Sequence, residues 1–171
     1  MRKVLSLLLL FLVLCACTTK EEKKRAVKKV NFEKRYAQIK DDANLEMGST
    51  YLPVYSHVYQ MHENNNLYLT ITTSMRNTSV RDTLFIYKID YFQTNGNKIR
   101  EYLKQPIYIK PLETIEIIIE QNDREGGSGA NFIFDWAISD KKNPPLFEAV
   151  MISTYGQQGV SFTTKGTQIY N

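Results

Sequence analysis

Apolar and polar residues alternate with a period of two along much of this chain. The clearest run is 67–75, where Leu67, Leu69 and Ile71 alternate with polar or aromatic residues. Successive side chains of a β-strand point to opposite faces, so this pattern predicts strands with one buried and one solvated face. No long window shows the 3.6-residue apolar repeat of a helix. Similar alternation occurs at 83–92, 115–120 and 132–138.

The number and spacing of these runs predict an all-β fold. We expect roughly eight short strands with turn residues between them. The pattern favours an antiparallel β-sandwich that is immunoglobulin-like, with a barrel of similar size as the alternative. The expected strands are 51–59, 67–75, 83–92, 99–103 continuing at 107–110, 115–120, 132–138, 146–155 and 160–170.

Two details of these strands can be predicted from local sequence. Asn95-Gly96 lies between two apolar runs, which predicts a hairpin with a type I′ turn, where both central residues have positive φ. In the run 83–92, the alternation places Phe85, Tyr87, Ile89 and Tyr91 on one face. The single Trp, Trp136, is expected to point into the core.

Both cysteines of the chain, Cys15 and Cys17, lie near its beginning. A disulfide inside the predicted domain is therefore impossible, and so is a Cys nucleophile or a zinc ribbon there. An exported domain without disulfides needs a hydrophobic core, which residues 43–171 are numerous enough to supply.

The first residues have the pattern of a bacterial export signal. Arg2 and Lys3 precede the apolar run 4–14, which is too short for the about 20 residues that span a bilayer. The following residues 14–17 resemble the lipobox of bacterial lipoproteins. That resemblance implies a signal peptide at 1–16 and acyl chains on Cys17, which becomes the mature N-terminus. The alternative is an ordinary cleaved signal that releases a soluble protein.

Residues 17–42 are rich in charge and poor in apolar residues. They carry nine Lys or Arg and five acids, whereas 43–171 carries 11 and 13, so the predicted domain is mildly acidic. This argues against nucleic-acid binding, which places positive charge on the fold. The segment 17–42 is expected to be a disordered or partly helical tether, or a basic segment lying on anionic headgroups. Residues 20–22 resemble the short signal that sends some bacterial lipoproteins to the outer face of the outer membrane.

A glycine-rich stretch at 123–131 is the main candidate for a binding site. Its backbone N–H groups could form an anion nest, and its acids could help to hold a cation. The third interpretation is a connecting loop whose glycines supply positive φ. The candidate residues are Asp123, Glu125, Gly126, Gly127, Ser128, Gly129 and Asn131.

Other chemical sites are weakly supported. His57, His62 and Glu63 are a poor metal set, because the two histidines would face opposite sides of a sheet. Glu116 and Glu120 are within reach of each other, but a solvated sheet face explains them better than a glycosidase pair. No G-x-S-x-G motif occurs. Tyr68, Tyr102, Tyr108 and Tyr155 are candidates for exposed aromatic contacts.

Several short segments resemble a known family when they are taken together. They are 51–56, 74–79, 90–92, 95–96, 100–103, 111–114 and 126–132. The chain resembles an uncharacterised bacterial lipoprotein family, a domain of unknown function numbered thirty-one twenty-four, over most of 50–155. The resemblance implies an exported lipoprotein domain and brings no activity and no catalytic residues.

The sequence therefore predicts a lipid-anchored protein of the bacterial cell envelope, with the outer membrane favoured over the inner. We expect a non-enzymatic module without cofactor, catalytic residues or metal. It would bind a partner, with a protein favoured over a glycan. The alternative is a lipoprotein that binds a small ligand, an anion or another ion through the 123–131 loop.

Overall fold

The computed structural model describes residues 30–39, 44–154 and 159–169. The predicted signal peptide 1–16, Cys17 and the tether as far as residue 29 lie outside the described residues, and so does Tyr155. No helix in the described ranges is long and apolar enough to cross a membrane.

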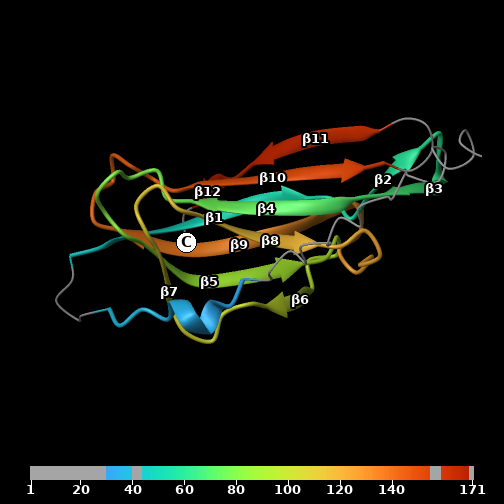
Figure 1. The fold of residues 1–171 in the computed structure, drawn as a ribbon. Coiled ribbons are helices and arrows are strands. Elements are labelled where there is room, and N and C mark those ends of the chain that lie inside the picture. The colour runs from blue at the N-terminus through green and yellow to red at the C-terminus, as the bar shows by residue number, and fades with distance from the viewer. Residues whose placement is uncertain (1–29, 40–43, 155–158, 170–171) are drawn as a thin grey trace, which may run out of the picture.

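Two antiparallel sheets form the body of the molecule and pack against each other as a sandwich (Figure 1). The six-stranded sheet has the order β12-β1-β9-β5-β6, with β7 also paired to β5. Its strands are β1(Glu46–Val54), β5(Leu84–Phe92), β6(Lys98–Glu101), β7(Ile107–Ile109), β9(Ala130–Ile138) and β12(Thr167–Ile169). The four-stranded sheet has the order β11-β10-β4-β8, from β4(Thr70–Arg76), β8(Thr114–Ile119), β10(Leu146–Ser153) and β11(Val160–Lys165).

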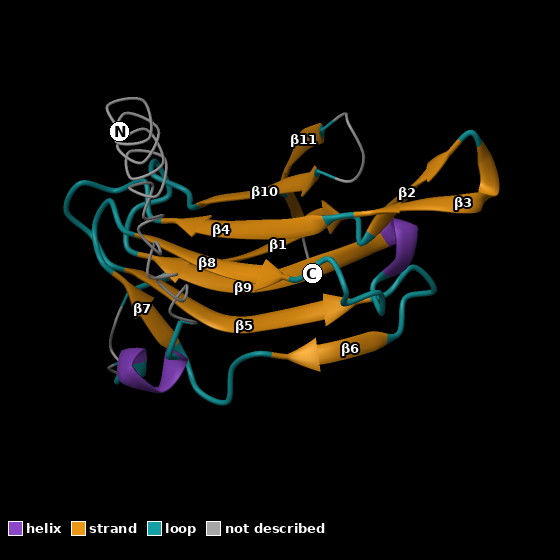
Figure 2. Ribbon diagram, turned by 45° about the vertical axis from the view of Figure 1, so that its right-hand side comes forward, coloured by secondary structure: helices purple, strands orange, loops and turns teal. Residues whose placement is uncertain are grey.

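Two further strands form a small ribbon outside both sheets. They are β2(His57–Gln60) and β3(His62–Tyr68), which pair only with each other in the described part of the chain. The ribbon extends beyond one end of the sandwich in both views (Figure 2). Two short 3₁₀ turns complete the described elements, η1(Phe32–Arg35) and η2(Gly127–Gly129).

The all-β, antiparallel prediction is confirmed, but the described residues form twelve strands, more than the eight expected. The run 51–59 divides between β1 and β2, and the run 67–75 divides between the end of β3 and β4, which belong to different sheets. The C-terminal run divides between β11 and β12. Gly166 is the point at which the chain passes from one sheet to the other, and its N–H donates to the Phe147 carbonyl at 2.8 Å. A Cβ there would lie 2.6 Å from Thr50 Cγ2, so the crossing needs a glycine.

The predicted hairpin at Asn95-Gly96 is present, since β5 pairs with β6. The predicted type I′ turn is wrong, because Gly96 has φ +85° while Asn95 has no positive φ. The Gly96 N–H donates to the Gln93 carbonyl at 2.8 Å, as in a type I turn that ends in a left-handed glycine. The Asn95 side chain accepts from the Asn97 N–H at 2.9 Å and so supports the turn without entering the left-handed region itself.

The face predicted for the run 83–92 is only half correct. Ile89 and Tyr91 are fully buried as expected, but Phe85 and Tyr87 are only partly buried. Leu84 and Ile86 occupy the inner face instead. The reason is a register shift against β9 between Ile86 and Lys88, where a bulge changes which side the following residues face.

Aromatic rings fill the middle of the sandwich. Phe134 stacks on Phe132 at 5.6 Å between ring centroids, and on Phe147 of the opposite sheet at 4.5 Å. Trp136 is 4% exposed, which confirms its inward orientation, and its Nε1 donates to Thr50 Oγ1 at 2.9 Å. Each large side chain buried in this way contributes about 1.5–3 kcal/mol of hydrophobic stabilisation.

Candidate functional site

The glycine-rich stretch connects β8 to β9 at the same end of the sandwich as the β2–β3 ribbon (Figure 2). Gly126 belongs to this stretch and is buried, with φ −65° and ψ −39°, values that any residue can adopt. What requires glycine at this position is space. An added Cβ would collide with the Tyr91 hydroxyl and lie 2.6 Å from Ser56 Oγ.

Gly127 has φ +79°, the left-handed conformation that favours glycine. The backbone around it is held by two neighbouring turns. The Ser56 N–H donates to the Gly127 carbonyl at 2.9 Å, and the Thr94 N–H donates to the Gly126 carbonyl at 3.0 Å. The Gly129 N–H donates to Thr94 Oγ1 at 2.9 Å. These contacts support the interpretation of the glycines as a fitted connecting loop.

The two acids of the loop converge on one guanidinium. Arg100 Nη2 lies 2.6 Å from Asp123 Oδ2 and 2.8 Å from Glu125 Oε2. Burial alone would lower the pKa of Arg100, but its hydrogen bonds to Glu125 and Asp123 outweigh burial and raise that pKa above its ordinary value. Arg100 is therefore a fixed positive charge, and any cation at these acids has to displace it.

The remaining predicted residues of the stretch lie apart from these acids. Ser128 Oγ donates to Tyr59 Oη at 3.3 Å and so links the loop to the ribbon. Asn131 is the second residue of β9, opposite Pro53 and Phe92 in the register. The structure thus places Asp123 and Glu125 on one guanidinium group and packs the glycines against the turns that contain Ser56 and Thr94. The seven candidate residues do not line one common cavity.

Aromatic side chains gather on the ribbon. The His57 ring contacts the rings of Tyr59 and Tyr68 edge-on, with centroids at 5.6 and 5.7 Å. The Arg124 guanidinium lies 3.9 Å above the Tyr68 ring. Burial lowers the pKa of His57, which keeps this imidazole neutral near pH 7.

The tip of the ribbon is open to solvent. Tyr59 is 59% exposed and Met61 is 92% exposed. Met61 also has φ +63°, a conformation that costs a non-glycine residue about 1–2 kcal/mol. Neither residue, nor Arg124, could be recognised as a site residue from the sequence, whose pattern marks Tyr59 only as part of an expected strand.

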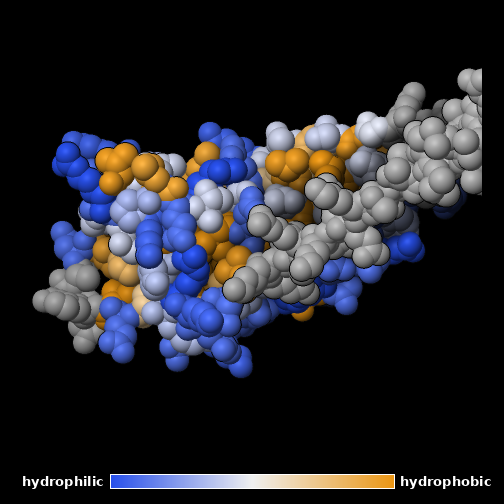
Figure 3. Space-filling view, in the orientation of Figure 1, coloured by the Kyte–Doolittle hydropathy of each residue, from blue (hydrophilic) through white to orange (hydrophobic). Residues whose placement is uncertain are grey.

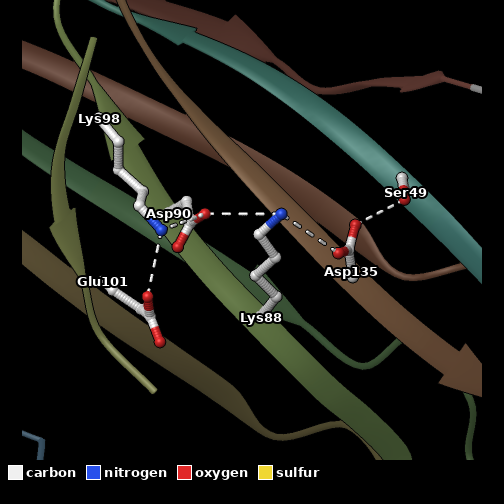
Figure 4. Close-up of polar contacts among 6 residues, drawn as sticks. All are labelled: Ser49, Lys88, Asp90, Lys98, Glu101 and Asp135. Atoms are coloured by element: carbon white, nitrogen blue, oxygen red, sulfur yellow. Dashed lines mark hydrogen bonds and ion pairs between the residues drawn. The ribbon is translucent and has the colours of Figure 1, made fainter. Parts of the chain in front are cut away.

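A row of charged residues crosses the outer face of the six-stranded sheet (Figure 4). Lys88 Nζ lies 3.5 Å from Asp90 Oδ2 and 3.7 Å from Asp135 Oδ2. Lys98 Nζ lies 3.4 Å from Asp90 Oδ2 and 3.1 Å from Glu101 Oε2. Ser49 Oγ donates to Asp135 Oδ1 at 2.6 Å. The row therefore joins β1, β9, β5 and β6 through side chains.

Asp90 is the most enclosed member of the row, with its side chain 3% exposed. Its Oδ1 is buried and has no hydrogen-bond donor among the described residues. Both lysines bond the other oxygen, so the carboxylate is held as a bridge between them. Sequence reasoning missed this row, because alternation marks Lys88 and Asp135 only as a polar strand face.

The other residues that the sequence suggested as candidates do not come together in one site. Glu116 and Glu120 are exposed, and Glu116 Oε1 accepts from Ser74 Oγ at 3.4 Å. Tyr68, Tyr102 and Tyr108 are half-buried, and Tyr155 lies outside the described residues. His57 is half-buried at the base of the ribbon, opposite Tyr68, whereas His62 is at its exposed tip. No three His, Cys, Asp or Glu residues within 30–39, 44–154 and 159–169 are grouped so that they could hold a metal ion.

The described residues form an all-β domain of the sandwich-like class, with an aromatic ribbon and a glycine-rich loop at one end. The chain belongs to the family described as Protein of unknown function (DUF3124), which matches residues 47–169. This confirms the family expected from the sequence, and the family description indicates no activity.

Two further comparisons were made. A solved structure, "Crystal Structure of Thermotoga maritima 1070", is similar with a TM-score of 0.45 and 9% sequence identity. The match covers 70% of this chain and 92% of that one. No curated protein matches the sequence significantly.

Proposed function

We propose that this chain is a lipid-anchored protein of the bacterial cell envelope whose sandwich domain binds a partner protein without catalysing a reaction. The leader and Cys17 support the anchor, and several acyl chains on that cysteine make membrane attachment durable. We place the protein at the outer membrane, with surface exposure as a further part of the proposal. The finer classification of its sandwich as immunoglobulin-like also belongs to this proposal.

The observation that carries partner binding is the composition of the ribbon end, by which we mean Tyr59, Met61, Tyr68 and Arg124. Tyr, Met and Arg are the residue types enriched at the centre of protein interfaces. Tyr59, Met61 and Tyr68 belong to a ribbon that is part of neither sheet, and Tyr59 and Met61 are mostly exposed. Arg124 contacts Tyr68 from the loop between β8 and β9. The hydrogen bond from Ser128 to Tyr59 connects the ribbon to the glycine-rich loop.

This surface also suits a protein better than a glycan. Met61 is an unbranched apolar side chain at the tip, and such side chains adapt to apolar partner surfaces. Arg124 already covers the face of Tyr68, so that ring cannot stack on a sugar without moving the guanidinium. A glycan partner is the second expectation.

Photo-crosslinking tests the proposal in intact cells. A photoreactive amino acid is placed at position 59 or 61 of the full chain, and the crosslinked protein is identified by mass spectrometry. The purified partner is then titrated against the Tyr59→Asp/Met61→Asp variant, for which we expect at least about tenfold weaker binding. Val80→Asp is the matched control, because Val80 is 68% exposed and lies in the β4–β5 connection. Equal affinity of the partner for wild type, for Tyr59→Asp/Met61→Asp and for Val80→Asp would contradict the proposal.

A second candidate function uses the loop at 123–131 as a site for a small ligand, an anion or another ion. The proximity of Asp123 and Glu125, with Glu125 61% exposed, favours it. A thermal-shift screen of the full chain with phosphate, sulfate, Ca²⁺ and Mg²⁺ tests this function, since a bound ligand stabilises the folded state by mass action. Stabilisation by Ca²⁺ that is lost in Glu125→Gln would place a cation at the loop.

A further inference from the structure

We propose that the free edge of β8 binds an extended segment of a partner polypeptide as an added strand. Strand addition needs an unpaired sheet edge, and β8 pairs with β4 on one side only. On its other side, no backbone hydrogen bond joins residues 114–119 to the rest of the described chain. Among the described residues, this edge therefore presents a row of unpaired backbone donors and acceptors.

The β8 edge differs from the β7 and β6 edges of the other sheet. The β7 edge is covered, since Tyr36 bridges Ile107 and the Ala37 N–H donates to the Pro106 carbonyl at 2.9 Å. The β6 edge carries Lys98 and Arg100 along its four residues. Proteins protect edges with covering segments, lysines and prolines. The six residues of β8 include no lysine or proline, and no strand of the described ranges pairs with its outer side.

A groove runs along this edge on the open side of the sandwich. It has a volume of about 620 Å³, within the range of about 300–1,000 Å³ typical of ligand sites. Residues 114–118 of β8 form one wall. Val30, Phe32 and Tyr102 supply the apolar part of the other wall and also pack against the core. Arg35 and Arg100 line the groove as well, and each is paired with an acid.

The segment 30–36, which forms part of the other wall, is held against the sandwich by an ion pair and a backbone bridge. Arg35 forms a two-bonded ion pair with Glu113, the residue that precedes β8, with N–O distances of 2.6 and 3.0 Å. This pair and the Tyr36 bridge hold the segment 30–36 at a fixed place beside the groove. A preorganised groove of this kind reduces the ordering cost of binding.

The side chains of β8 determine what the added strand must carry. Glu116, Ile118 and Glu120 face outward, and Ile118 is 42% exposed. Opposite charges directly across two strands are favourable and like charges are unfavourable. The occupant is therefore a segment with Lys or Arg opposite the two acids, a β-branched residue opposite Ile118, and small apolar side chains on its inner face. The same acids disfavour pairing with a second β8 edge.

A synthetic peptide provides the test. The probe is a fluorescein-labelled peptide, Lys-Val-Thr-Val-Lys-Val, titrated by anisotropy into the full-length chain in detergent. We expect saturable binding, and slower hydrogen exchange of the amides at 114–119 in the complex. A peptide of the same composition in scrambled order, and one with alternate backbone nitrogens methylated, are expected not to bind. Equal binding of either control, or no saturable binding of the probe, would overturn the proposal.

Reversing the charge of the acids along the groove provides a second, independent test of peptide binding. We expect Glu116→Lys and Glu120→Lys each to weaken probe binding about fivefold. Glu63→Lys is the matched control, because Glu63 is exposed on the ribbon and not part of the groove. An effect no larger than that of the control would contradict strand addition at β8. A concentration-dependent dimer whose formation depends on Glu116 would show that a second copy occupies the edge, which also overturns the proposal.

The inference is independent of the ribbon end. Tyr59→Asp is expected to leave probe binding unchanged, because Tyr59 does not line the groove. Failure of the partner-binding test and failure of the peptide test can therefore be distinguished.

Discussion

Arg35 and Glu113 lie 78 residues apart in the chain and form two parallel hydrogen bonds, in which Arg35 Nη1 donates to Glu113 Oε2 and Arg35 Nη2 donates to Glu113 Oε1. The pair joins the 3₁₀ turn η1 to the turn before β8, and each side chain is about one quarter exposed. The contact anchors the first described residues to the sandwich and shapes the groove beside β8.

The pair predicts a pH-dependent contribution to stability. The hydrogen bond from Arg35 lowers the pKa of Glu113 below its ordinary value of 4.5. A carboxylate with a lowered folded-state pKa stabilises the fold above about pH 4.5, and this contribution is lost as the pH falls through the folded-state value. We expect Arg35→Met to lower the free energy of unfolding by about 1 kcal/mol at pH 7, a value limited by solvent screening.

Urea unfolding of wild type and Arg35→Met at pH 7 and pH 3 measures this effect. The difference between the two proteins should shrink at pH 3, which lies below the ordinary pKa of the Glu113 carboxyl group. Arg81→Met is the control, because Arg81 is exposed. A difference that stays constant between the two pH values would show that Arg35 acts by packing alone.

The stacked rings in the core predict the largest effect of a single substitution. Phe134→Ala removes the ring that contacts both Phe132 and Phe147, and so opens a cavity between the sheets. We expect a loss of about 3–5 kcal/mol in the free energy of unfolding. Ile152→Ala, at a site that is 42% exposed, should cost much less. Comparable losses for the two variants in urea unfolding would contradict the packing described for Phe134.

The space around Gly126 predicts a substitution with a specific rescue. Gly126→Ala should destabilise the fold by about 1–3 kcal/mol, because its methyl group would collide with the Tyr91 hydroxyl. Tyr91→Phe removes that hydroxyl and also its contact with Ser56 at 3.2 Å. The double variant should therefore be more stable than the sum of the two single effects predicts, as measured by thermal unfolding. Strict additivity would mean that Tyr91 is not the obstacle.

The leader predicts where the protein is held. Cys17→Ala should prevent acylation, since no other cysteine follows it in the sequence. The mass of the mature N-terminal peptide from purified membranes should show acyl chains on wild type and none on the variant. Fractionation should then find less of the variant in the detergent-extracted membranes. A variant that stays wholly in that fraction would contradict the anchor.

Much of the fold could be predicted from the sequence, because the alternation of side chains along a strand is a local property. The runs that contain Ile117 and Phe134 were found as single strands with the expected inner residues, and Ile71 faces inward within β4. The prediction failed where a long-range contact alters the local pattern. The bulge at Ile86–Lys88 arises from pairing with β9, and the sheet change at Gly166 depends on Thr50 and Phe147.

The candidate site shows the same division. The sequence identified the glycine-rich stretch by its composition, but it could not show that Thr94 and Ser56 hold its backbone. Its acids were recognised as a pair, yet their shared partner Arg100 is distant in sequence. The exposure of Tyr59 and Met61 was invisible beforehand, because it results from a ribbon that joins neither sheet.

Most of the strand pattern, the lack of any disulfide in the domain and the expectation of a cleaved and acylated leader follow from the sequence alone. These are properties of adjacent residues, and they need no knowledge of distant neighbours. The three-dimensional arrangement was needed to find the unpaired strand edges of the described residues, the charges that meet and the groove beside β8. Those features depend on strand order and register, which are set by contacts between residues far apart in the chain.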